Sequence, residues 1–143
     1  MRILTVLVVD ESPARLDVAK KQLAGHKVTV VDNYNDAQDL LSVEYCYEVV
    51  LVSPFVSISN HGQEIPGGIF LAILAADMGA KFVGLLNVSN HHDHPTLSFI
   101  DKLSFGDLLI GGSKVDFSFK PLGSSSEKWQ RLLYHQKSQE ISK

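Results

Sequence analysis

The N-terminal stretch Ile3-Leu4-Thr5-Val6-Leu7-Val8-Val9-Asp10-Glu11-Ser12-Pro13 decides the fold. Its first seven residues are nearly all apolar and rich in β-branched side chains, which is typical of a parallel strand buried on both faces. Ser12 and Pro13 then supply a helix N-cap followed by proline at the first helical position. Apolar residues continue at helical spacing from Leu16 to Leu23. The stretch therefore predicts a buried strand that leads directly into a helix.

The rest of the chain repeats this alternation. Short apolar runs predict further strands, and the segments between them carry helical spacing and capping residues. A chain in which strands alternate with helices builds βαβ units, and these units form a parallel sheet with helices on both faces. We therefore predict a doubly wound, five-stranded parallel α/β sheet. The four later strands are expected at residues 27–31, 48–52, 82–86 and 114–119.

Composition limits the class of protein. The chain has 143 residues, 45% of them hydrophobic and 20% charged, which suits one globular domain over residues 1–143 with a polar tail at 136–143. The net charge of -3 provides no basic field for nucleic acid. Cys46 is the only cysteine, so no internal disulfide forms. With no signal-peptide pattern and no apolar run of membrane-spanning length, we expect a cytoplasmic protein that does not bind membranes.

Polar residues gather where the predicted strands end. In a doubly wound sheet, functional groups collect at the carboxyl ends of the strands. Each of the first, third, fourth and fifth strands is followed by a side chain capable of polar chemistry. These residues are Asp10 and Glu11, Ser53, Asn87 and Ser89, and Lys120.

This placement resembles the receiver domain of response regulators, over most of the chain. The resemblance implies the flavodoxin-like, or CheY-like, strand order 2-1-3-4-5. In that family an acidic pair and an aspartate after the third strand bind Mg²⁺, and the aspartate accepts a phosphoryl group. A Thr or Ser after the fourth strand corresponds here to Asn87 or Ser89, and both assignments stay open. The family lysine, which precedes a proline, corresponds to Lys120, and Phe117 stands where receivers often carry a switching aromatic residue.

Ser53 departs from the family pattern, because it stands where the phosphate-accepting aspartate is expected. Serine provides neither the carboxylate nucleophile nor the carboxylate ligand that a hard cation prefers. We therefore expect a degenerate receiver, or pseudo-receiver, that is no enzyme and requires no cofactor. Mg²⁺ binding through Asp10 and Glu11 would be weakened, and an ion pair of Lys120 with these acids would replace the metal.

Two insertions, near residues 54–66 and 88–113, are expected to flank this pocket. The first carries His61, and the second carries His91, His92 and His94. Imidazole is a common ligand of zinc-like ions, so a metal site in the second insertion is one hypothesis. A second is that the loop covers the pocket as a lid. The remaining reading is that these residues are solvated or cap the helix after them.

The functional prediction is a signalling module that acts through phosphorylation-independent protein–protein interaction in a two-component-type pathway. The segment 69–78 is apolar nearly all round, which favours a buried helix or one pressed against another subunit. We expect a protein partner or a homodimer, with contact through Ile69, Phe70, Ile73 and Leu74. The alternative is a flavodoxin-like protein that binds a metal or small molecule with the His91/His92/His94 loop.

Overall fold

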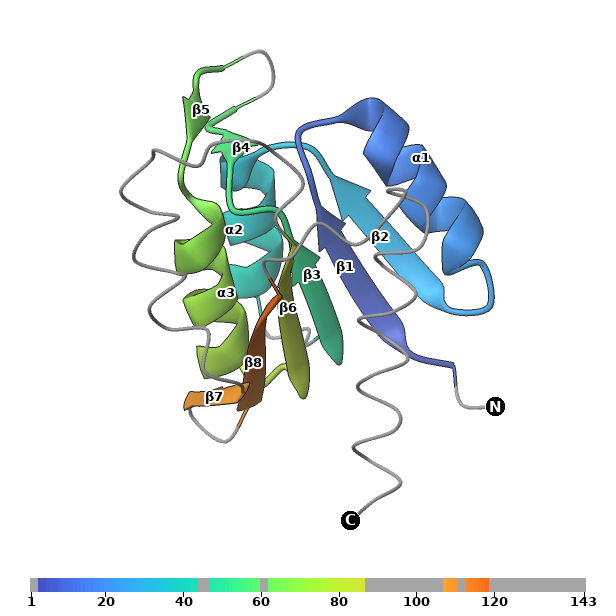
Figure 1. Cartoon of the computed structure of the whole chain (residues 1–143), viewed down its shortest axis with the longest axis vertical. Helices are drawn as coiled ribbons and strands as arrows, with labels where there is room; N and C mark the ends of the chain where they lie inside the picture. The colour runs from blue at the N-terminus through green and yellow to red at the C-terminus, as the bar shows by residue number, and fades with distance from the viewer. Residues whose placement is uncertain (1–2, 44–46, 60–61, 87–106, 111–112, 119–143) are drawn as a thin grey trace.

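The structure is a computed structural model that describes residues 3–43, 47–59, 62–86, 107–110 and 113–118 (Figure 1). Three helices and eight strands fall within these residues. In chain order they are β1 (Thr5–Val9), α1 (Pro13–Gln22), β2 (Lys27–Val31), α2 (Tyr34–Ser42), β3 (Val49–Val52), β4 (Val56–Ser57), β5 (Glu64–Ile65), α3 (Gly68–Asp77), β6 (Phe82–Leu86), β7 (Asp107–Ile110) and β8 (Ser113–Ser118).

The main sheet has the order β2-β1-β3-β6-β8-β7. Its first five strands pair in parallel, and they confirm the predicted order 2-1-3-4-5, with β6 and β8 as the fourth and fifth strands. The sixth strand, β7, pairs antiparallel with β8 at the edge of the sheet. Strand β7 was not predicted, because a four-residue strand inside an expected insertion carries too short a pattern to recognise.

The predicted helices on both faces of the sheet are also confirmed. Alternate residues of β1 point to opposite faces, as the strand period of two requires. Val6 and Val8 pack with residues of α1, whereas Leu7 and Val9 pack with residues of α2 and α3. Figure 1 shows α1 on one side of the sheet and the pair α2 and α3 on the other.

Local capping fixes where the helices begin. The Ser12 side chain accepts a hydrogen bond from the Arg15 amide at 3.3 Å, as expected for the N-cap of α1. In α2 the cap is Asn33, whose side chain accepts from the Asp36 amide at 2.9 Å. The Asn33 backbone is extended and pairs with Ser57 in an isolated bridge, so the helix begins directly after it.

The first expected insertion contains ordered structure. Strands β4 and β5 form a short antiparallel hairpin in which Val56 pairs with Ile65 and Ser57 with Glu64. The Asn35 amide donates to the Ile58 carbonyl at 3.0 Å, and this bond ties the hairpin to the start of α2. No strand was predicted within this insertion. In Figure 1 the hairpin stands at the carboxyl end of the sheet, above α2 and α3.

Helix α3 ends in a glycine turn that returns the chain to the sheet. Gly79 has a φ of 101°, a conformation that favours glycine. Its amide donates to the Ala76 carbonyl and the Ala80 amide donates to the Ala75 carbonyl, both at 3.1 Å, which is the Schellman pattern. Among the described residues, no helix is long and apolar enough to cross a membrane.

Candidate functional site at the carboxyl edge of the sheet

Asp10 and Ser53 stand side by side at the ends of β1 and β3. The last residues of these strands, Val9 and Val52, are paired in register, and the Ser53 amide donates to the Val9 carbonyl at 2.9 Å. Both residues are buried: Asp10 is 0% exposed and Ser53 is 4% exposed. The strand ends therefore bring together the two residues that the sequence analysis assigned to one pocket.

The buried Asp10 carboxylate is satisfied within the chain. Its Oδ1 accepts a hydrogen bond from the Ser12 amide at 2.9 Å, and its Oδ2 accepts from Arg15 Nε at 2.8 Å. The hydrogen bond to Asp10 raises the pKa of Arg15 further above its ordinary value. A buried carboxylate is strongly disfavoured unless it is paired and hydrogen-bonded, and this one is both.

Arg15 was missed by the sequence analysis, which named Lys120 as the cation of this pocket. Lys120 lies outside the described residues. One signal in the sequence could have pointed to Arg15. It lies in the first turn of α1, where the helix dipole disfavours a positive charge, so a nearby acidic partner was to be expected. Because α1 begins directly after its N-cap Ser12, the side chain of Arg15 in the first turn reaches the Asp10 carboxylate.

Glu11 interacts with the β4–β5 hairpin as well as with Arg15. Ser57 Oγ donates weakly to Glu11 Oε2, at 3.5 Å, and the side chain of Glu64 also hydrogen-bonds Glu11. The pKa of Glu11 is raised to about 7, first by burial, then by the hydrogen bond and negative charge of Glu64 and by the charge of Asp10. Arg15 lowers it. Burial and Glu64 therefore favour the neutral, protonated form of the Glu11 carboxyl group.

Gly68 explains how α3 is placed against this site. Its amide donates to the Pro54 carbonyl at 3.0 Å, directly after Ser53. A Cβ atom at Gly68 would lie 2.0 Å from the Ser53 carbonyl oxygen. Only glycine allows the helix to begin this close to the end of β3.

The Mg²⁺ ion that the receiver resemblance implies does not suit these residues. The residue after β3, beside Asp10, is Ser53 and supplies no carboxylate, and a guanidinium already contacts the Asp10 carboxylate. Glu11 shares its hydrogen bond with a second carboxyl group, Glu64, which favours the protonated form. Within the described ranges, no group of three or more His, Cys, Asp or Glu side chains is placed to hold a metal ion.

The other predicted site residues are not placed by the structure. Asn87, Ser89, His61, His91, His92, His94 and Lys120 lie outside the described residues. Phe117 falls in β8, where its backbone is in register with Leu85 of β6. The described site thus consists of Asp10, Glu11, Arg15 and Ser53, with Ser57 and Glu64 from the hairpin.

Solved structures of receiver domains resemble the chain, among them the following two. One is a response regulator receiver domain protein (CheY-like) from Methanospirillum hungatei JF-1, with a TM-score of 0.59 and 16% identity over 99% of this chain and 100% of that one. The other is the BeF3-activated DrrB receiver domain, with a TM-score of 0.56 and 14% identity over 95% and 99% of the two chains. No protein-family model matches the chain, and no curated protein matches it significantly. At these identities the likeness establishes the fold: the chain has the flavodoxin-like architecture of CheY-like receiver domains.

Proposed function

We propose that this chain is a response-regulator-like signalling module of the pseudo-receiver kind, which acts by protein–protein interaction without phosphorylation. Ser53 is the observation that carries the proposal. Its amide is bonded to the end of β1, so the residue stands beside Asp10 at the strand end where a receiver needs a carboxylate. A serine hydroxyl cannot form the acyl phosphate of that reaction. The proposal therefore includes no enzymatic activity and no required cofactor.

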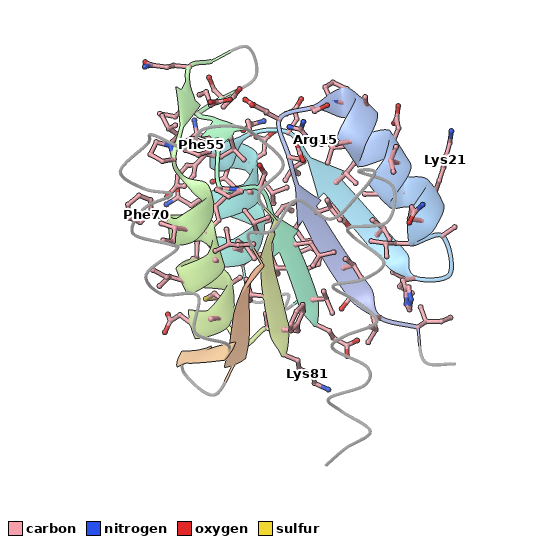
Figure 2. The ribbon with its side chains drawn as sticks, in the orientation of Figure 1. Arg15, Lys21, Phe55, Phe70 and Lys81 are labelled. Atoms are coloured by element: carbon pink, nitrogen blue, oxygen red, sulfur yellow. The ribbon has the colours of Figure 1, made fainter. Side chains whose placement is uncertain are left out.

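The partner-binding part of the proposal is supported by the outer side of α3. Phe70 is 60% exposed and Ile73 is 45% exposed, and Figure 2 shows Phe70 directed away from the sheet. Ile69 is buried and Leu74 packs against the core, so only two of the four expected contact residues are available. Large exposed apolar side chains that lie together mark interaction surfaces. We propose a protein partner or a second copy of the chain at this surface.

The cellular setting follows from the same proposal. A two-component-type pathway places the module in the cytoplasm, with other proteins as its partners. The net charge of -3 supports the exclusion of nucleic acid as a partner, because phosphate backbones attract basic surfaces.

The direct test is incubation of the whole chain with acetyl phosphate and Mg²⁺, followed by intact mass spectrometry. A conventional receiver domain, treated in parallel, is the positive control. We expect a phosphoryl adduct on the control and an unchanged mass for this chain. A hydroxylamine-sensitive adduct on an aspartate of this chain would overturn the proposal.

A further inference from the structure

The contact between Arg15 and Asp10 is the only ion pair of the described residues that reaches a fully buried carboxylate. Arg15 Nε lies 2.8 Å from Asp10 Oδ2, and the Asp10 side chain is 0% exposed while that of Arg15 is 28% exposed. The second described pair, between Lys81 and Glu48, is longer at 3.8 Å, and its side chains are 54% and 23% exposed. Figure 2 shows Arg15 and Lys81 at opposite ends of the sheet.

The contacts of the Asp10 carboxylate disfavour the binding of a second cation. The Ser12 amide donates a hydrogen bond to Oδ1, and the Arg15 guanidinium donates one to Oδ2. A divalent ion at this carboxylate would lie within a few ångströms of a guanidinium, and like charges so close repel strongly where water is excluded. The ion would have to displace a charge-assisted hydrogen bond, which is stronger than a neutral one.

We propose that the guanidinium of Arg15 is the resident cation at this strand end and excludes divalent metal from Asp10. The inference rests on the proposed function and deepens it, since it concerns the carboxylate beside Ser53. Restoring the missing carboxylate at Ser53 is then insufficient to restore a metal site. Arg15 is the residue that determines which cation the Asp10 carboxylate accepts.

The test compares two double variants of equal net charge. Ser53→Asp/Arg15→Gln removes the resident cation, whereas Ser53→Asp/Lys81→Gln removes a lysine from the far end of the sheet. Mg²⁺ binding is measured by titration calorimetry, after circular dichroism has shown that each variant is folded. We expect the Arg15 variant to bind Mg²⁺ at least about tenfold more tightly than the Lys81 variant, a difference of about 1.4 kcal/mol. Equal affinities would overturn the proposal.

A second measurement needs no substitution and covers the case in which a variant fails to fold. The Arg15 Nε–H resonance of the unaltered chain is followed by NMR as Mg²⁺ is added. We expect a resonance that stays protected and unshifted. Its loss or movement on Mg²⁺ addition, with shifts in the Asp10 and Ser12 amides, would overturn the proposal. Such metal binding without a phosphoryl adduct would leave the proposed function intact.

Discussion

The carboxyl edge of the sheet and the outer side of α3 adjoin each other and differ in chemistry. At the edge, the fully buried Asp10 carboxylate accepts hydrogen bonds from the Ser12 amide and the Arg15 guanidinium. On the outer side of α3, Phe70 and Ile73 are 60% and 45% exposed, and no charged residue separates them in the sequence. We call the carboxyl edge the polar region and the outer side of α3 the apolar region. The buried carboxylate of the polar region has its hydrogen-bond partners within the chain. The apolar region exposes hydrophobic surface to water, and burial of that surface by another molecule would be favourable.

This difference separates two kinds of function. A site for catalysis or metal binding has charged groups that become paired only when the ligand binds. At this edge, however, the Asp10 carboxylate is already paired with Arg15. A surface built for protein binding presents large apolar side chains, as α3 does with Phe70. For this reason we propose an interaction module. Substitutions in each region, and at the point where they meet, test that contrast.

The largest effect is expected at Gly68, where α3 meets the end of β3. Gly68→Ala would place a Cβ 2.0 Å from the Ser53 carbonyl oxygen, so backbone must move. We expect a loss of about 3 kcal/mol in the free energy of unfolding, measured by urea denaturation. Gly25→Ala is the matched control, because a Cβ there meets nothing within 4 Å. It should change stability by less than about 0.5 kcal/mol. Similar values for both variants would show that α3 is not seated on the strand end.

The next effect concerns the polar region. Arg15→Met removes the cation but keeps most of the apolar stem, and it leaves the Asp10 carboxylate buried without its partner. We expect a loss of about 2 kcal/mol at neutral pH, less than for a fully buried pair because Arg15 is partly exposed. Lys81→Met breaks the longer, exposed pair with Glu48 and should cost under about 0.5 kcal/mol. Equal losses would mean that the Arg15 contact is an ordinary surface pair.

Most of the fold could be predicted from the sequence, because its signals are local. The valine-rich run of β1 and the Ser12-Pro13 cap of α1 each specify an element without reference to the rest of the chain. The strands β4, β5 and β7 were missed. They have two to four residues, which is too few to show the alternating pattern of a strand.

The site was predicted in part for the same reason. Asp10 and Ser53 were placed together because strand ends in a parallel sheet share one edge. Arg15 and Glu64 were missed, since their roles depend on the reach of a side chain and on the docking of the hairpin. Sequence spacing indicates which strand end a residue follows, but it does not show which partner a long side chain contacts.

A smaller effect is expected on the apolar side. If Phe70 lies in an interface between two copies of the chain, Phe70→Asp should weaken self-association by about tenfold, or about 1.4 kcal/mol. Sedimentation over a range of concentrations measures this change. Ile3→Asp is the control, because Ile3 is also 60% exposed but precedes β1, away from α3. A chain that sediments only as a monomer at high concentration would contradict the homodimer and leave a different protein as the partner.

The smallest effect is a pH dependence at Glu11, where the hairpin meets the polar region. Its pKa is raised from 4.5 to about 7 in the folded chain, first by burial and then by Glu64. Below pH 4.5 the group is protonated whether folded or unfolded, so it imposes no cost. As the pH rises towards 7, the unfolded chain releases a proton that the folded chain retains, and stability falls. Above pH 7 the cost is complete.

Glu11→Gln removes that cost. We expect the variant to be more stable than the unaltered chain by about 1 kcal/mol at pH 8, a value reduced for solvent screening, and nearly equal to it at pH 4.5. Urea denaturation at several pH values measures the difference. Glu64→Gln should reduce the same pH dependence by removing the neighbouring carboxylate, whereas Asp39→Asn controls for the loss of one exposed negative charge on α2. A Glu11→Gln difference that stays constant from pH 4.5 to 8 would show that Glu11 is not held against the hairpin. The polar region would then keep a free carboxylate, and its contrast with α3 would weaken.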